Sequence, residues 1–194
     1  GKTDPIEDAR TVEIELILAD LQTAERAIER LAKQARRERE AQTAVSILEK
    51  VRAGLDNGQP LRSLELSTEE RDILETFRFL TAKPVLYVAN VAEDDLPAGN
   101  AAQLDPLRRA AETEGNALVP ICARLEEELA GLPPEEAELF MQEMGIEEPG
   151  LQRLVRSTAA LLDLICFITF NENEARAWRI RRGSTAVQAA GEIH

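Results

Sequence analysis

The chain has 194 residues, 44% of them hydrophobic, and its 23 basic and 36 acidic side chains give a formal net charge of −13. That length fits one large domain or parts of two, and the acidity argues against broad, nonspecific binding to nucleic acid. The single histidine, His194, and the two widely spaced cysteines exclude a histidine-based catalytic triad, a multi-histidine metal site and a disulfide framework.

The sequence shows no segment that would cross a membrane, because its longest apolar stretch, residues 161–170, is short and contains Asp163. The first residues do not have the pattern expected of a signal peptide. These features predict a cytoplasmic protein in a reducing environment. The chain begins with Gly1 rather than with methionine, and we interpret it as an internal piece of a longer protein.

The apolar residues nearest the N-terminus predict a helical hairpin. They recur at alternating spacings of three and four, the pattern of a coiled coil, and predict a helix over residues 13–40. A second apolar set within residues 44–55 can fold back on the first as an antiparallel helix, which the Asp-Asn-Gly-Gln-Pro segment at 56–60 ends. The first set is Ile14, Ile17, Leu21, Ala24, Ile28, Leu31 and Ala35.

Basic side chains gather near the predicted tip of this hairpin, at Lys33, Arg36, Arg37 and Arg39. Solvated helix faces often carry such charges, but a basic tip can also contact nucleic acid or an acidic partner. The pattern alone leaves both interpretations open.

Residues 84–122 have the pattern of a strand–helix–strand unit. The segment 84–90 is apolar up to its last residue and predicts a strand buried on both faces, as in a parallel sheet. After a loop over 93–100, a helix over 101–114 and a second short strand over 117–122 follow. Such a unit places its two strands parallel, with a right-handed crossover.

Further helices are expected on either side of this unit. Ser67 with the acidic residues after it predicts the start of a helix that runs through Leu80. After the second strand, helices are expected to start near Arg124, Pro133 and Pro149, since proline is tolerated in the first turn of a helix.

From residue 165 the pattern changes to strands over 165–170 and 175–181, followed by a short helix over 185–190. This ββα segment is too small to bury a core of its own, and we interpret it as the beginning of a second domain. Cys166 lies inside the first of these strands, which is apolar, and is expected to be inert.

Two loops follow the predicted parallel strands and form the candidate site. Ligands bind at the carboxyl ends of the strands in open α/β sheets, so Asn90 and Glu93 should face the same crevice as Cys122 and Ala123. An asparagine amide can donate to and accept from a purine edge, while the N–H groups of Cys122 and Ala123 line the other side of the base. Asparagine at a strand end is also a common turn residue, so the spacing alone leaves both interpretations open.

Several strings along the chain, in order, resemble the YchF family, whose eukaryotic member is called the Obg-like ATPase and which belongs to the Obg branch of P-loop NTPases. They are Asp4-Pro5-Ile6, residues 15–21, residues 81–91 (TAKPVLYVANV), residues 147–151, Arg176-Ala177-Trp178 and the closing Gln-Ala-Ala-Gly-Glu-Ile-His at 188–194. The resemblance covers essentially the whole chain, and the closing string is highly specific.

The resemblance implies an α/β protein, mostly helical by content, in four segments. Residues 1–12 would belong to the NTPase core and 13–80 to an inserted coiled-coil hairpin. Residues 81–163 would form the last part of the parallel sheet of the core, and 164–194 the beginning of a β-grasp TGS domain. The implied function is that of a ribosome-associated enzyme that binds ATP, or GTP, with Mg²⁺ and hydrolyses it.

The phosphate-binding residues are not found in this chain, which contains no Gly-x-x-x-x-Gly-Lys-Ser/Thr motif. The resemblance therefore implies that the catalytic residues and the Mg²⁺ ligands lie outside it and that the chain alone is inactive. The alternative is a non-enzymatic module whose hairpin and β-grasp surfaces dock on the ribosome or RNA.

The resemblance also implies how the base is selected. In most GTP-binding relatives of Ras, the loop equivalent to residues 90–93 has the sequence Asn-Lys-x-Asp, and its aspartate accepts two hydrogen bonds from guanine. Here Val91 replaces the lysine and Glu93 the aspartate, a carboxylate one methylene longer. The Asn-x-x-Glu motif of the family goes with a preference for ATP over GTP. Cys122 stands where Ras relatives have serine, and we interpret it as a small buried hydrophobe rather than a redox sensor.

Arginines gather around Trp178 in the second strand of the C-terminal segment, at Arg176, Arg179, Arg181 and Arg182. Strand alternation places Arg176 on one face with Trp178, and Arg179 with Arg181 on the other. A basic β surface can bind RNA phosphates, and the family links its TGS domain to ribosome association. An ordinary solvated strand is the alternative.

Overall fold

The computed structural model describes residues 4–96 and 104–193. His194, part of the predicted loop over 93–100 and the first residues of the predicted helix over 101–114 lie outside these ranges. The chain divides into two compact units, Gly1–Pro84 and Val85–His194. The α/β class predicted from sequence is confirmed: helices predominate, with one parallel and one antiparallel strand pair.

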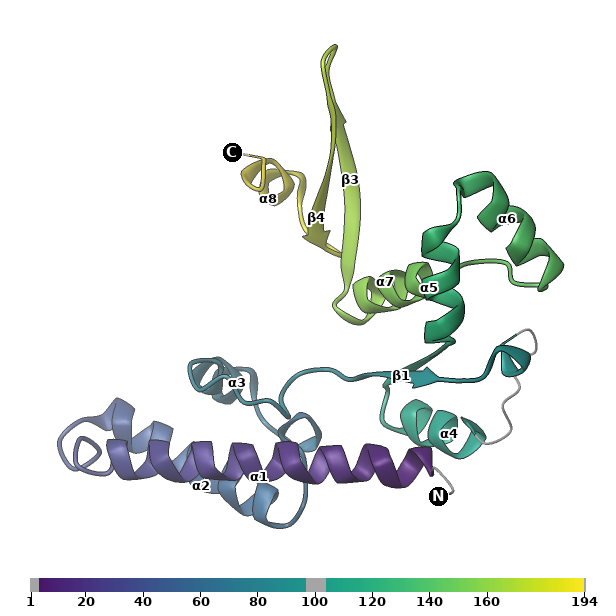
Figure 1. Ribbon diagram of the computed structural model, residues 1–194. Helices are drawn as coiled ribbons and strands as arrows, with labels where there is room; N and C mark the ends of the chain where they lie inside the picture. The colour runs from purple at the N-terminus through teal and green to yellow at the C-terminus, as the bar shows by residue number, and fades with distance from the viewer. Residues whose placement is uncertain (1–3, 97–103, 194) are drawn as a thin grey trace. The chain divides into compact units, whose positions relative to one another are not determined.

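The first unit is a helical hairpin with a short third helix (Figure 1). Helix α1 (Pro5–Leu31) begins where the Asp4 carboxylate accepts a hydrogen bond from the Ile6 N–H over 3.1 Å, and α2 (Arg39–Asp56) packs against it. The predicted bounds of 13–40 for the first helix are wrong. Helix α1 starts earlier, because Asp4 caps a helix that already includes Pro5. It also ends earlier, at Leu31, because the chain reverses before α2, in which Ala41 is buried.

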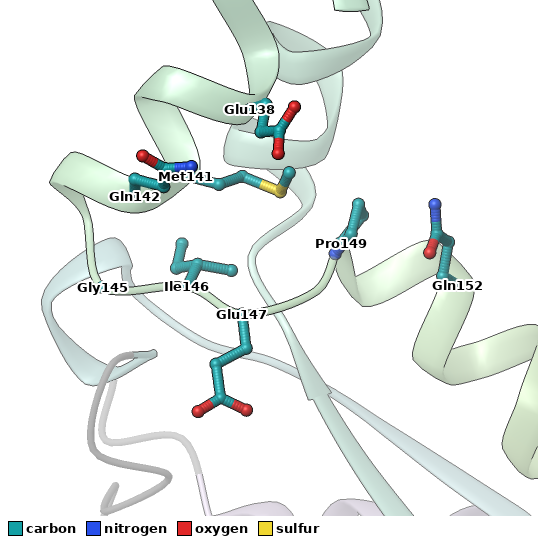
Figure 2. Close-up of a pocket in the computed structure, with 8 residues that line it drawn as sticks. All are labelled: Glu138, Met141, Gln142, Gly145, Ile146, Glu147, Pro149 and Gln152. Carbon is teal, nitrogen blue, oxygen red and sulfur yellow. The ribbon is translucent and has the colours of Figure 1, made fainter. Parts of the chain in front are cut away.

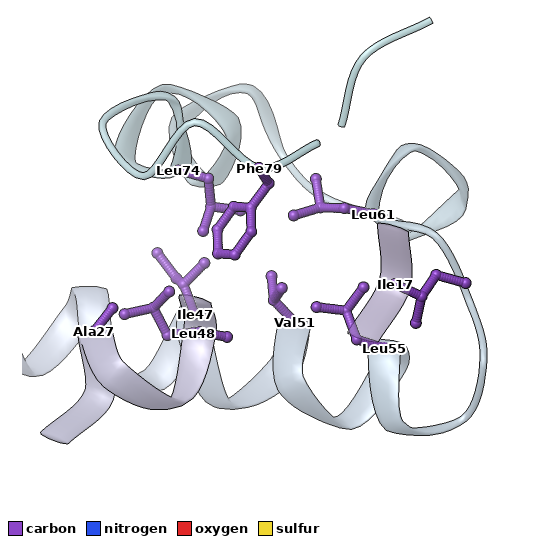
Figure 3. Close-up of a cluster of buried hydrophobic side chains, with 10 residues drawn as sticks. Ile17, Ala27, Ile47, Leu48, Val51, Leu55, Leu61, Leu74 and Phe79 are labelled. Carbon is purple, nitrogen blue, oxygen red and sulfur yellow. The ribbon is translucent and has the colours of Figure 1, made fainter. Parts of the chain in front are cut away.

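The core of this unit lies between the two helices and the segment that follows them. Leu48, Val51 and Leu55 of α2 are almost inaccessible to solvent and pack with Leu74 and Phe79 (Figure 3). Further members of the cluster include Ile17, Ala24, Ala27, Ile47 and Leu61. Aliphatic side chains therefore dominate this core, as the low aromatic content of the sequence requires.

The buried carboxylate of Asp20 in α1 binds the last residues of this unit. Asp20 is 2% exposed and accepts hydrogen bonds from the N–H groups of Leu80 (2.8 Å) and Thr81 (2.7 Å) and from the Thr81 hydroxyl (2.7 Å). Helix α3 (Thr68–Glu75) ends before this contact, so the predicted extension through Leu80 is wrong. The backbone N–H groups that bind Asp20 cannot also be helical donors, and Arg78 has a positive φ of 54°.

The second unit begins with two parallel strands, as predicted. Strand β1 (Leu86–Asn90) pairs with β2 (Ala117–Ile121), and Asn90 lies opposite Ile121 at the end of the register. Helix α4 (Asp105–Thr113) lies between them in sequence and contacts β2. The expected burial of β1 on both faces is wrong, because Val88 is 46% exposed and only β2 pairs with β1 among the described residues.

Three helices follow β2 close to their predicted starts: α5 (Ala123–Gly131), α6 (Pro134–Glu143) and α7 (Gly150–Leu161). An apolar cluster beneath the two strand ends contains Val91, Cys122, Leu125 and Leu129, and Phe140 and Met141 of α6 pack against it. The loops that carry the candidate site are therefore supported from below by a packed core.

The remaining elements are the hairpin of β3 (Leu164–Phe170) and β4 (Ala175–Arg181) and helix α8 (Ala186–Gly191), as predicted to within one residue. One face of the hairpin is half-buried and carries Phe167 opposite Trp178, whose indole N–H donates to the Thr169 hydroxyl over 2.9 Å. Cys166 lies on the other face and is exposed, because only one face of this strand is half-buried.

None of the helices within the described ranges combines the length and the apolar character that a membrane crossing requires.

Candidate nucleotide-base site

The two strand ends meet at a hydrogen bond. Asn90 is the last residue of β1, and its side-chain oxygen Oδ1 accepts from the backbone N–H of Ala123 over 3.0 Å. Ala123 is the first residue of α5, so the Asn90 side chain satisfies one of the N–H groups that a helix leaves without an intrahelical partner. The Val91 N–H donates to the Ile121 carbonyl over 2.8 Å and extends the strand ladder by one step.

This hydrogen bond fixes the orientation of the Asn90 amide. A backbone N–H can only donate, so the oxygen of the side chain must face Ala123, and the Nδ2 group faces the other way. The geometry changes one expectation, because the Ala123 N–H is bound to Asn90 rather than turned toward a base. Asn90 Nδ2 makes no hydrogen bond within residues 4–96 and 104–193, and it can donate to an acceptor such as N7 of a purine.

The first loop is acidic and partly anchored in the core. Val91 is 8% exposed and packs into the apolar cluster, so its side chain supports the loop from inside. Glu93 opens a short 3₁₀ helix, η2 (Glu93–Asp95), and is half-buried. The Val91 side chain therefore faces the apolar core, whereas the side chains of Glu93, Asp94 and Asp95 are accessible to solvent at least in part.

Arg124 pairs with Glu128 of the same helix. Its Nε donates to Oε1 of Glu128 over 3.1 Å, and this hydrogen bond, with the negative charges of Glu128 and then Glu93, raises the pKa of Arg124 above its ordinary value. Its position directly after Ala123 is the signal that could have placed it beside the candidate site.

Cys122 is 4% exposed and is the residue that precedes α5. It packs with Leu125 and Leu129 in the apolar cluster. The interpretation of Cys122 as a small buried hydrophobe is confirmed, since a reactive thiol requires access to solvent.

The basic residues proposed to contact RNA lie in two places, each described within its own unit. Arg36 and Arg37 are exposed in the turn between α1 and α2. Arg179 and Arg181 share the exposed face of β4 and make no ion pair within the described residues. Arg182 lies past the end of β4, where its Nε donates to the Asp163 carboxylate over 3.1 Å, so part of its charge is already compensated.

Comparisons with known proteins show what the chain is similar to. Residues 164–194 match the family model YchF-GTPase_C, described as a protein of unknown function (DUF933). The ribosome-binding ATPase YchF of Escherichia coli O157:H7 is 45% identical over 195 residues, which cover 100% of this chain and 53% of the relative. The protein of the same name from Bacillus subtilis is 39% identical over 197 residues, covering 100% of the chain and 54% of the relative.

A solved structure agrees with these relatives. The YchF GTPase of Schizosaccharomyces pombe superimposes with a TM-score of 0.86 at 31% identity, over 100% of this chain and 53% of that one. The chain thus spans about half the length of the relatives that it matches. The resemblance stated from sequence is confirmed: over its whole length, the chain is homologous to proteins of the YchF family.

Proposed function

We propose that the chain supplies the base-recognition part of a ribosome-binding nucleotide hydrolase, and that Asn90, Val91, Glu93, Cys122 and Ala123 surround the base. The observation that carries the proposal is the 3.0 Å hydrogen bond between Asn90 and Ala123, which joins the carboxyl end of β1 to the start of α5. Ligands of α/β sheets bind at such strand ends. The names of the relatives, ribosome-binding ATPase and YchF GTPase, support the activity.

Within this site, Asn90 Nδ2 would donate to N7 of the base, and the Val91 carbonyl would accept from the 6-amino group of adenine. Guanine has a carbonyl at this position, so it gives Val91 no donor. The small Cys122 side chain would leave room beneath the ring, because it is withdrawn into the apolar cluster. These contacts favour adenine.

The preference for ATP over GTP would be reinforced by Glu93. A carboxylate that accepts from N1–H and the 2-amino group of guanine must stand at a fixed distance, and glutamate is one methylene longer than the aspartate that does so. Adenine offers neither donor. By analogy with bidentate base contacts, loss of this pair costs GTP about 1–3 kcal/mol.

Mg²⁺ would stabilise the charge that develops on the phosphates during in-line attack by water. The chain has no Gly-x-x-x-x-Gly-Lys-Ser/Thr motif to hold them, so the residues described here would bind and orient the base only. We therefore expect no hydrolysis by this chain on its own.

For the segments, we propose residues 13–80 as the inserted coiled-coil hairpin, 81–163 as part of the NTPase core, following residues 1–12, and 164–194 as the beginning of a TGS domain. The division of the chain at Pro84 and Val85 lies close to the second of these boundaries. A ribosome as partner would place the protein in the cytoplasm.

A second candidate function, a non-enzymatic module that docks on the ribosome or RNA, is favoured by the exposed basic residues. Arg179 and Arg181 lie side by side on one open β face, and Arg36 and Arg37 on an open helical tip. In this function nucleotide is irrelevant, and the same arginines would contact phosphates.

Titration of the full-length protein with ATP separates the two functions. The Asn90→Ala variant should bind ATP roughly tenfold more weakly than the wild type, because it loses a hydrogen bond to the base and its support at Ala123. The matched control is Asn173→Ala, which removes an exposed amide from the β3–β4 turn. Unchanged ATP affinity in Asn90→Ala would remove the base site and leave the docking module.

A further inference from the structure

The negative charge of the chain is concentrated in one part of the second unit. From Leu125 to Gln152 there are nine glutamates and no lysine or arginine. Three of them have internal roles. Glu126 accepts from the N–H groups of Gly150 (2.6 Å) and Leu151 (3.1 Å) at the start of α7, Glu128 pairs with Arg124, and Glu148 pairs with Arg156. The other six are Glu127, Glu135, Glu136, Glu138, Glu143 and Glu147.

An open cavity of about 670 Å³ lies within this acidic stretch, between α6 and the start of α7 (Figure 2). Its centre is apolar, because the Met141 and Ile146 side chains line it. The same two side chains also pack against the apolar cluster of this unit. Figure 2 shows these two side chains between the Glu138 carboxylate on one side and Glu147 on the other. The cavity therefore offers an apolar floor between two carboxylates.

Neither carboxylate at this cavity is neutralised within the described residues. Glu138 and Glu147 are exposed and make no ion pair there, whereas Glu148 beside them does. The side-chain amides of Gln142 and Gln152 also line the cavity and can bind a peptide backbone. The site thus has uncompensated negative charge, apolar surface and amide groups together.

Carboxylates and apolar side chains also lie together on the other side of α6. A second hollow of about 450 Å³ is lined by apolar side chains, among them Leu139, which is 61% exposed, and by carboxylates. No described residue of α6 is fully buried. The lining residues are Leu132, Glu135, Glu136, Leu139, Phe140 and Glu143.

We propose that α6 and the loop that follows it form a docking site for a basic segment of a partner protein, in which lysines or arginines alternate with apolar residues. A lysine stem can lie on Met141 and Ile146 while its ammonium group reaches Glu138 or Glu147. Charge complementarity selects this occupant. RNA is repelled by the carboxylates because its phosphates are negative, and the net charge of −13 disfavours a second copy of this chain as the occupant.

A metal ion is a less suitable occupant. No group of three or more acidic, histidine or cysteine side chains that could hold one occurs in the described part of the chain. The proposal does not depend on nucleotide binding, since the cavity shares no residue with the candidate base site. A failure here would leave the proposed function untouched.

The test uses the full chain and a fluorescently labelled short peptide of alternating lysine and leucine, with fluorescence anisotropy as the measurement. The double variant Glu138→Lys/Glu147→Lys should bind the peptide at least roughly tenfold more weakly. The control, Glu112→Lys/Glu172→Lys, changes the net charge equally at exposed glutamates outside the cavity and should bind as the wild type does. Thermal melting verifies that both variants fold.

A second peptide tests the apolar floor. Replacing the leucines with serines should weaken binding to the wild type roughly tenfold, because the apolar contact is lost. The proposal is overturned if the wild type does not bind the lysine–leucine peptide, if both double variants lose the same affinity, or if the serine peptide binds equally well. Equal loss in the two variants would show that net charge alone attracts the peptide.

Discussion

Asn90 and Ala123, 33 residues apart in sequence, are joined by a 3.0 Å hydrogen bond from the Ala123 N–H to Asn90 Oδ1. One side chain therefore has two separable groups: an oxygen that caps α5 and an Nδ2 group turned away from it. The oxygen stabilises the fold, and the Nδ2 group is the one that the proposed function assigns to the base. Substitutions that separate these groups therefore test function apart from stability.

Glu93→Asp should shift base selection toward GTP. Shortening the carboxylate by one methylene restores the length found in guanine-binding relatives, so the ratio of GTP to ATP affinity should rise roughly tenfold. The measurement is competitive titration of the full-length protein with both nucleotides. Asp94→Glu, which changes the length of the neighbouring carboxylate, is the control and should leave the ratio unchanged. An unaltered ratio in Glu93→Asp would contradict the role given to Glu93.

Asp20→Asn should destabilise the first unit by about 3 kcal/mol. The Asp20 carboxylate accepts three hydrogen bonds with both oxygens, and an asparagine NH₂ group would face one or more N–H donors instead. The measurement is the free energy of unfolding in urea. Asp56→Asn, at the exposed end of α2, should change this free energy by less than about 0.5 kcal/mol. Equal effects of the two substitutions would show that the buried Asp20 carboxylate contributes no more to the free energy of unfolding than an exposed one does.

Acid should weaken the start of α3 through Glu70. The pKa of Glu70 is lowered from its ordinary value of 4.5, first by the hydrogen bond from the Ser67 backbone N–H and then by the one from Lys50. A depressed folded-state pKa contributes stability that is present above pH 4.5 and is lost as the pH falls below it. Glu70→Gln keeps an acceptor for Ser67 but cannot titrate.

The measurement for Glu70 is the melting temperature as a function of pH. The wild type should lose more stability than Glu70→Gln between neutral pH and the acid side of 4.5. Parallel curves for the two proteins would show that Glu70 makes no pH-dependent contribution.

Reversing the charge of the basic β face should weaken binding to ribosomes. Arg179→Glu/Arg181→Glu replaces two exposed, uncompensated cations and should reduce co-sedimentation of the full-length protein with ribosomes roughly tenfold at low salt. Arg176→Glu/Lys83→Glu makes the same charge change away from that face and is the control. Arg36→Glu/Arg37→Glu tests the hairpin tip in the same way. Equal sedimentation of every variant would exclude both surfaces.

Local signals in the sequence were sufficient for much of the fold. Proline before α6 and α7 predicted their starts to within a residue, and the apolar runs around Val88 and Val119 predicted a parallel pair. The failures have long-range causes. The end of α3 depends on Asp20, far away in sequence, and the exposure of Val88 depends on which elements cover β1.

The candidate site was predictable in its position but not in its bonding. Strand order alone placed Asn90 near Ala123, because neighbouring parallel strands end at the same edge. The pattern could not show that the Ala123 N–H is bound by Asn90, nor that Arg124 pairs with Glu128, since both depend on side-chain orientation.

The most direct test of the central claim is ATP titration of the Asn90→Asp variant, with its melting temperature measured alongside. Aspartate keeps an oxygen for the Ala123 N–H at the start of α5 but has no Nδ2 group to donate to a base. If Asn90 Nδ2 donates to the base, this variant should have a melting temperature close to that of the wild type and an ATP affinity at least roughly tenfold lower. Wild-type affinity for ATP in the folded variant would show that Asn90 Nδ2 makes no contact with the base.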